Sequence, residues 1–183
     1  MKDFARDETR FSLCGLNCLL CPMRTGGYCP GCGGGEGNQS CAIARCSLEH
    51  GAVPFCWECP SYPCGRYEDF DAADSFVPHR TRAEDAALAR ELGLDAYLAR
   101  LEERRAALDA LLGRYNDGRR KTMFHAAAYL LPIEELRAVL EALESRPGRG
   151  EQPVKERALA AAVLLQEAAK RRGVSLKLEK KGK

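Results

Sequence analysis

The sequence predicts an α-helical protein in which a small, irregular, cysteine-rich metal-binding module packs on a domain of four to five helices. All ten cysteines lie between Cys14 and Cys64, in a stretch with few aliphatic residues and many glycines and prolines. From Thr81 onward cysteine is absent, and aliphatic residues recur at helical spacing. We expect a metal-binding module of knuckles and loops at 11–67, a connector at 68–80, a helical domain at 81–173 and a basic tail at 174–183.

Charge and the N-terminal residues restrict the class of protein. The chain has 28 Lys and Arg against 26 Asp and Glu, a net charge of +2. This balance does not favour nucleic acid as the main partner, since nucleic-acid binding needs a strong positive field. The segment from Met1 to Glu8 is charged, and no run of apolar residues is long enough for a membrane span. We therefore expect a cytoplasmic protein without membrane contact.

The cysteines are better explained by metal than by disulfides. Cytosolic thiols stay reduced, so an even count of ten does not indicate five bridges. Three pairs have the C-x2-C spacing of metal knuckles, and glycine or proline lies beside most cysteines. Free or redox-active thiols are the remaining alternative. The candidate metal ligands are Cys14, Cys18, Cys21, Cys29, Cys32, Cys41, Cys46, Cys56, Cys59 and Cys64.

Zinc is the first metal that these residues suggest. Cys29-Pro-Gly-Cys32-Gly resembles a zinc knuckle, because proline and glycine let backbone amides turn toward the thiolates. Cys18 and Cys21 are candidate partners for this knuckle. A second site is expected from Cys46, Cys56, Cys59 and Cys64. Two four-cysteine sites need eight thiols, so Cys14 and Cys41 are either ligands in another arrangement or free.

An iron–sulfur cluster is the alternative cofactor. It also takes four thiolates, and the C-x2-C pairs followed by proline, at Cys21-Pro22 and Cys59-Pro60, are compatible with one. Spacing does not separate zinc from iron. The knuckle favours zinc, and so does the absence of the familiar run of closely spaced cluster cysteines.

Two enzyme interpretations have less support. Cys14-x3-Cys18-x2-Cys21 has the spacing of the radical SAM motif, but the repeated βα units of that fold are absent. Cys56-Trp-Glu-Cys59 has redox-motif spacing without a surrounding βαβ pattern, and metal ligands with Trp57 packed over the site explain it better. We expect a non-catalytic protein and assign no catalytic residue.

Start and stop signals predict the helices. Within the module, Ser40 is expected to cap a helix over 41–50. In the connector, we expect Phe70 and Phe76 to dock the module onto the helices. The helical domain is predicted from a Thr81 to Glu84 capping box, an Asp95 cap, a helix with Met123 and Phe124, Pro132 in the first turn of a fourth helix, and Pro153 at the start of the last. The composition of 146–152 indicates a linker, and 174–178 alternates like a short strand.

Histidines and one basic cluster are weaker candidates. His50 lies between cysteine pairs and could bind metal, although a solvated helix end explains it better; His79 reads as connector and His125 as a half-buried helix residue. Arg119, Arg120 and Lys121 follow an Asn-Asp-Gly turn at an expected helix start, where cations oppose the helix dipole. They form a candidate anion site, with a plain solvated face as the alternative.

Three cysteine motifs resemble a bacterial and archaeal family. These are Cys14-Gly15-Leu16-Asn17-Cys18-x2-Cys21, Cys41-x-Ile43-x2-Cys46, and Cys56-x-Glu58-Cys59-x3-Pro63-Cys64. Over residues 11–67 they are similar to the family catalogued as domain of unknown function 3795, whose members are suspected to bind zinc or another metal. The helical remainder resembles an extension found in one branch, often seen in anaerobes. The resemblance implies metal binding in the cytosol and implies no activity.

Together these observations predict a zinc-binding protein whose metals hold the module in shape for contact with a protein partner. An iron–sulfur redox or electron-transfer protein is the alternative, and a thiol-dependent enzyme is the third interpretation.

Overall fold

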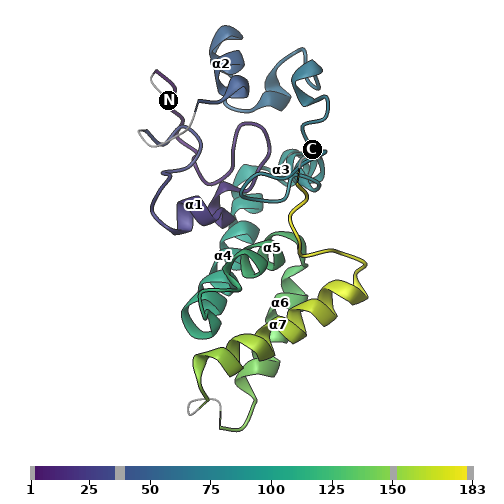
Figure 1. The fold of residues 1–183 in the computed structure, drawn as a ribbon. Coiled ribbons are helices and arrows are strands. Elements are labelled where there is room, and N and C mark those ends of the chain that lie inside the picture. The colour runs from purple at the N-terminus through teal and green to yellow at the C-terminus, as the bar shows by residue number, and fades with distance from the viewer. Residues whose placement is uncertain (1–2, 36–39, 149–151, 181–183) are drawn as a thin grey trace. The chain divides into compact units, whose positions relative to one another are not determined.

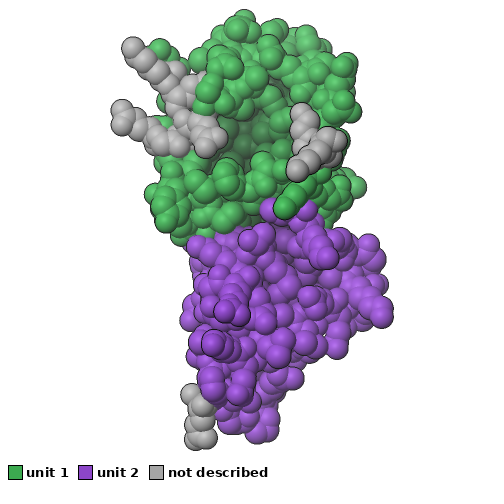
Figure 2. All heavy atoms as spheres, viewed as in Figure 1, with its two compact units in different colours: residues 1–101, 179–183 green, residues 102–178 purple. Residues whose placement is uncertain are grey.

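The computed structural model describes residues 3–35, 40–148 and 152–180, and in these residues it is helical and without strands (Figure 1). The chain divides into two compact units, unit 1 with residues 1–101 and 179–183, and unit 2 with residues 102–178 (Figure 2). The α-helices are α1 Pro22–Thr25, α2 Ala42–Glu49, α3 Arg82–Leu92, α4 Leu94–Tyr115, α5 Lys121–Leu130, α6 Ile133–Glu144 and α7 Val154–Arg171. The 3-10 helices are η1 Cys18–Leu20, η2 Cys56–Glu58 and η3 Gly65–Tyr67.

The expected fold class is confirmed: an irregular cysteine-rich region packs on helices within unit 1. It has a small apolar cluster of Phe4, Leu13, Ile43 and Ala44, against which several cysteines lie. A second group is aromatic, where the buried Phe11 ring lies 4.9 Å from the Tyr97 ring of α4. These two groups are small for so long a stretch of chain, as expected of a region that needs additional stabilisation.

A hydrogen-bond network joins the first cysteine motif to α3 and α4. The Asn17 amide donates to Asp85 at 3.0 Å, and the Tyr97 hydroxyl lies 2.8 Å from an oxygen of each. Gly15 has φ +97°, and a Cβ there would lie 3.0 Å from the Arg82 carbonyl oxygen. The motif therefore needs glycine at position 15 for its close approach to α3. It needs asparagine at position 17 to pair with the Asp85 carboxylate of that helix.

Replacing Asn17 by Ala should lower the free energy of unfolding of unit 1 by about 1–3 kcal/mol, because buried polar groups of Asp85 and Tyr97 lose a partner. Urea unfolding followed by Trp57 fluorescence measures it. The control is Asn116→Ala, which removes an exposed turn hydrogen bond to Gly118 in unit 2. Equal effects of the two substitutions would contradict the importance of the network.

Residues at the far end of the chain complete unit 1. The Asp74 amide donates to the Glu179 carbonyl at 2.8 Å, and the Glu179 amide donates back to the Asp74 carboxylate at 2.8 Å. Arg80 lies 3.3 Å from the Asp74 carboxylate and 3.7 Å from that of Glu179. Segments about a hundred positions apart in sequence thus form one clasp.

Unit 2 has an ordinary helical core. The part of α4 after Leu101 and helices α5, α6 and α7 bury one face each, as amphipathic helices do. The fully buried side chains include Leu108, Leu111, Tyr115, Phe124, Leu136, Leu143 and Leu165. Burial of side chains of this size stabilises a fold by roughly 1.5–3 kcal/mol each, so unit 2 has apolar stabilisation of its own.

Several local predictions need correction. Cys41, rather than Ser40, is the N-cap of α2, and Thr81 caps α3 without a side-chain cap bond because its hydroxyl donates to Asp85 at 2.9 Å. Phe76 is half exposed, so only Phe70 docks as expected.

At the C-terminal end, residues 174–178 form no strand, since within the described residues no neighbouring strand is present to pair with them. Residues 149–151 of the predicted linker and 181–183 of the predicted tail lie outside the described residues. No described helix combines the length and apolar character needed to cross a membrane.

Candidate metal centres

Two C-x2-C pairs, Cys18 with Cys21 and Cys56 with Cys59, each form a single 3-10 turn of the same type. The amide of Cys21 donates to the carbonyl of Cys18 at 3.0 Å across η1, and that of Cys59 donates to Cys56 at 3.0 Å across η2. A 3-10 helix has three residues per turn, so side chains at i and i+3 eclipse. Each turn therefore directs both thiols of its pair toward one side.

Four cysteines line one cavity of about 30 Å³ in unit 1. They come from α2, from η2 and its end, and from the residue before η3. Tyr62, Tyr67 and Ile43 complete part of the wall. These cysteines, which we call the second set, are the predicted second site: Cys46, Cys56, Cys59 and Cys64.

The electrostatics of Cys56 reflect this arrangement. Burial raises the pKa of its thiol to about 11, the neighbouring Tyr67 hydroxyl opposes the rise, and the negative charges of Cys64, Cys46 and Cys59 add to it. Four thiolates near one point repel one another unless a cation lies between them. The pKa of Cys56 thus reflects the three other cysteines that line the cavity with it.

The remaining cysteines include a first set of Cys14, Cys18, Cys32 and Cys41, which affect one another electrostatically. Burial raises the pKa of Cys14 to about 12, with a hydrogen bond to Ser12 opposing and Cys32 and Cys41 adding to the rise. Burial also raises the pKa of Cys18, and Cys32, Cys14 and Cys21 raise it further. The first set therefore combines Cys14 and Cys18 of the first motif with Cys32 and Cys41 from other motifs.

Backbone amides are directed at the sulfurs of the first set. The amides of Leu16, Cys32 and Leu13 lie near the sulfurs of Cys14, Cys18 and Cys32, respectively, and lower the pKa of each thiol, while the Leu16 amide donates to the Ser12 hydroxyl at 2.7 Å. N–H donors of this kind offset the charge of metal-bound thiolates. The loop from Ser12 to Leu16, closed by a 2.8 Å hydrogen bond between the Ser12 amide and the Leu16 carbonyl, holds the Cys14 end in place.

The predicted knuckle of Cys29 and Cys32 has neighbouring cysteines on both sides, and its role as one metal unit stays a prediction. The Cys32 amide is used by the Cys18 sulfur, and the local turn begins later, with Gly34 donating to Gly31 at 3.1 Å. Cys29 instead lies near Cys21, whose pKa is raised by burial first and by the Cys29 charge to a smaller extent. Since Cys21 also raises the pKa of Cys18, the four cysteines of the predicted site, Cys18, Cys21, Cys29 and Cys32, have electrostatic links to one another, and their grouping stays a prediction.

The two sets share supporting elements. Helix α2 has Cys41 at its N-cap and Cys46 in its second turn, so it supplies one thiol to each set. Leu13 donates its amide to the Cys32 sulfur and accepts the Cys56 amide on its carbonyl at 2.8 Å. The positions of the two sets are therefore not independent.

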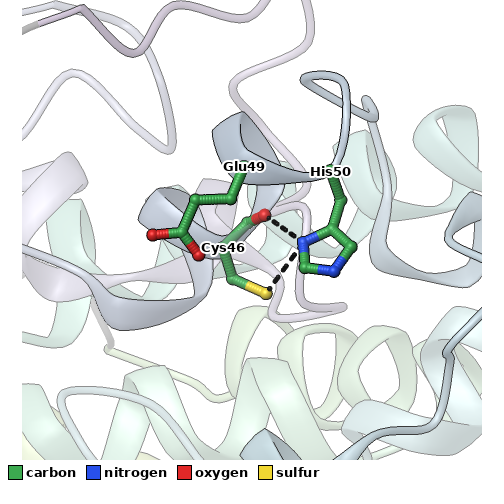
Figure 3. A group of neighbouring side chains, drawn as sticks. All are labelled: Cys46, Glu49 and His50. Atoms are coloured by element: carbon green, nitrogen blue, oxygen red, sulfur yellow. Dashed lines mark hydrogen bonds between the residues drawn. The ribbon is translucent and has the colours of Figure 1, made fainter.

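One trio has its ligand atoms closer together than the thiols of either set (Figure 3). Among the described residues, only Cys46, Glu49 and His50 place three candidate ligand atoms within 4.8 Å of one another. His50 Nδ1 lies 3.6 Å from the Cys46 sulfur but also 2.8 Å from the Cys46 carbonyl oxygen. Because Nδ1 is bonded to that carbonyl oxygen and His50 is exposed, we assign His50 as a neighbour of the candidate ligand Cys46 and not as a ligand itself.

The cysteine thiols are suitable donor atoms for a metal, but their sulfurs lie farther apart than in an occupied zinc site. A tetrahedral zinc with bonds of about 2.3 Å holds its sulfurs about 3.8 Å apart, and no three described cysteine sulfurs are within 4.8 Å of one another. Binding must therefore draw the thiols inward and displace their protons, as thiolate sites generally require.

The other predicted candidates are placed as follows. His79 is buried, with Nδ1 2.9 Å from the Phe70 carbonyl oxygen and Nε2 2.9 Å from the Ser75 hydroxyl, so its role is structural. His125 is buried within α5. In the basic cluster, Asp117 pairs with Arg120 and accepts the Arg119 amide at 3.0 Å, so a carboxylate of the chain already lies there. The anion site stays a prediction.

Some structurally important residues of unit 1 lie outside the sequence predictions. Arg6 and Tyr67 lie beside cysteines of the first and second set, and Arg82 lies beneath the first motif. None of these three had a sequence signal, in contrast to Gly15 and Asn17, which lie at fixed positions between two cysteines of the first motif.

No family model, curated protein or solved structure matches this chain. The resemblance to the family of domain of unknown function 3795 therefore stays a prediction, and the class that fold and site support is that of a cysteine-rich helical protein.

Proposed function

We propose that this chain is a non-catalytic, cytoplasmic metal-binding protein in which two centres of four thiolates hold unit 1 in shape. The observation that carries the proposal is the convergence of Cys46, Cys56, Cys59 and Cys64 on one cavity. These residues lie up to 18 positions apart in sequence and come from separate elements. Four thiols are the complete ligand set of a structural tetrahedral site.

Zinc is the metal that the donor set favours. Four cysteine thiolates are the complete ligand set of a structural zinc ion, and no inorganic sulfide is needed. The first set has the same number of thiols and amide donors to three of them. We accordingly propose two zinc ions per chain, with Cys21 and Cys29 outside both centres.

The proposed role is to present a surface to a protein partner. In unit 1, Tyr28 is 71% exposed and Phe76 is 49% exposed. Aromatic side chains are enriched at protein interfaces, and a metal-stabilised loop region presents them at low cost in conformational entropy.

Single Cys→Ser substitutions test the assignment by metal content. Wild-type chain should retain two zinc ions, and Cys59→Ser and Cys32→Ser should each retain one, because serine removes a thiolate from one centre only. Cys29→Ser is the matched control, which should retain two. Elemental analysis measures the zinc content per chain of the wild type and the three purified variants. Absence of metal from the wild type, or equal loss in Cys29→Ser and Cys32→Ser, would contradict the assignment.

An iron–sulfur cluster is the second candidate, and the spacing of the sulfurs favours it. The thiols of the second set surround the cavity at separations wider than one zinc ion requires, as a larger centre would need. Protein purified without oxygen distinguishes the two candidates. Visible absorbance with iron and acid-labile sulfide supports the cluster, and colourless protein with zinc supports the single ions.

A further inference from the structure

Four buried polar side-chain atoms lack a hydrogen-bond partner in the part of the chain that the structure describes. They are Arg6 Nη2, Tyr67 Oη, Tyr115 Oη and Arg157 Nε. Buried polar groups are almost always hydrogen-bonded, so each such atom indicates strain, water or an absent ligand. One arginine and one tyrosine belong to unit 1, where each lies beside a thiol set, and the other two belong to unit 2, which has no cysteine.

Arg6 is held with its guanidinium against the first set. Its Nε donates to the Pro54 carbonyl at 3.0 Å, its Nη1 donates to the Phe11 carbonyl at 3.0 Å, and its charge lies 4.8 Å from the centre of the Phe55 ring. The Arg6 amide also donates to the Gly33 carbonyl at 3.1 Å. Both backbone and side chain of Arg6 are thus fixed next to Cys32.

The charge of Arg6 has no carboxylate partner within salt-bridge distance among the described residues. It lies near the Cys32 sulfur and lowers the pKa of that thiol by charge and by hydrogen bonding, although burial raises it more. A partly buried guanidinium without a counterion is unfavourable. Four thiolates around a divalent ion carry a net charge of −2, which would supply the missing anion.

Tyr67 occupies the corresponding position at the second set. Its ring is enclosed by Tyr62, Phe70 and the Arg82 guanidinium, with centres 5.3, 5.6 and 4.3 Å away. The hydroxyl lies so close to Cys56 that each group alters the pKa of the other, yet it has no hydrogen bond of normal geometry. Its packed ring holds a donor at the cavity wall.

We propose that Arg6 Nη2 and Tyr67 Oη are hydrogen-bond donors to metal-bound thiolates, Arg6 at Cys32 and Tyr67 at Cys56. This inference rests on the proposed function and assigns two positioning residues to it. When the thiols move inward and lose their protons, each sulfur becomes a charged acceptor, and the two unpartnered donors gain partners. Both donors withdraw negative charge from the centre and slow exchange of its metal.

Conservative variants with matched controls test the proposal on the full-length chain. Tyr67→Phe removes only the hydroxyl, and Tyr115→Phe removes the other buried, unpartnered hydroxyl from unit 2. Arg6→Gln removes the charge, Arg6→Lys retains it, and Arg157→Gln is the control in unit 2. Zinc affinity is measured by competition with a chromophoric chelator, and cobalt(II) replaces zinc to report sulfur-to-metal charge-transfer bands.

We expect Tyr67→Phe to weaken zinc binding about fivefold, the equivalent of one ordinary hydrogen bond, and Arg6→Gln to weaken it tenfold or more, as for a charged donor. Arg6→Lys should recover part of the loss. The charge-transfer bands should shift to lower energy in Tyr67→Phe and Arg6→Gln, because thiolates that lose a donor are more easily oxidised. The two unit 2 controls should leave affinity and bands unchanged.

The outcomes separate this inference from the proposed function. Wild-type chain that binds neither zinc nor cobalt contradicts the proposed function itself. Wild-type binding with Tyr67→Phe and Arg6→Gln indistinguishable from their controls, in affinity and in band position, overturns the donor assignment alone. If the isolated centre contains iron, the same variants should lower its reduction potential, and an unchanged potential overturns the assignment.

Discussion

Chelation of the bound metal should unfold residues 11–67 and leave the helices of unit 2 intact. Among its described residues the cysteine-rich region buries fewer large apolar side chains than unit 2 does, and structural zinc contributes about 10–16 kcal/mol to such a region at neutral pH. The core of unit 2, by contrast, is built from fully buried leucines of α4, α6 and α7. Loss of metal therefore removes the main stabilising contribution from one unit only.

Hydrogen exchange measured peptide by peptide, before and after addition of a strong chelator, checks this expectation. Amides that pair across η1 and η2, such as those of Cys21 and Cys59, should lose protection. Amides near Leu165 in α7 are the internal control and should keep it. Protection at Cys21 and Cys59 that survives complete metal removal would show that the region folds without metal.

Substitution of Arg82 by Ala should lower the free energy of unfolding of unit 1 by about 1.5–3 kcal/mol, the usual contribution of a hydrogen bond to a charged group, since the Asp71 side chain is 35% exposed. The Arg82 side chain is 5% exposed and pairs with Asp71 at 2.6 Å and 2.7 Å. It also donates to the Cys14 carbonyl at 3.3 Å. One side chain thus joins α3, the connector and the first cysteine motif.

The check is urea unfolding of the metal-loaded chain, with Arg137→Ala as the control. Arg137 makes an ion pair of 2.9 Å with Glu103, in which both side chains are more than half exposed, so its loss should cost no more than about 1 kcal/mol. The Arg82 variant should also release metal faster, because the Cys14 carbonyl loses its donor. A loss of unfolding free energy as small as that of Arg137→Ala would show that unit 1 does not depend on the Arg82 contacts to Asp71 and Cys14.

Periodicity and Gly or Pro signals were sufficient to predict the helices. Five helices follow Thr81 as expected, and Pro132 and Pro153 each lie at a helix start. The cap of α3 was not predictable, because the Thr81 hydroxyl bonds to Asp85 in the same helix, and that carboxylate is held by Asn17 and Tyr97. Caps depend on tertiary neighbours, whereas helix existence depends on the local pattern.

The grouping of cysteines could be predicted only where it is local. Cys56 and Cys59 share a turn of one helix type, which their spacing predicts. The first set depends on the path of the whole loop region, and the Cys32 amide is used by Cys18, outside its own C-x2-C unit. The donors Arg6 and Tyr67 have no spacing signal because each reaches its cysteine through the fold.

The clasp between Asp74 and Glu179 has a consequence for the order of assembly in the cell. Ribosomes extend a chain from its N-terminal end, so all ten thiols are made long before Glu179. In the proposed function, the nascent chain can therefore acquire metal while unit 2 is still being translated. The two hydrogen bonds between Asp74 and Glu179, one through the Asp74 amide and one through its carboxylate, form only after translation has reached Glu179. If metal binds as proposed, loading can thus precede the contact between Asp74 and Glu179 that joins the two distant segments of unit 1.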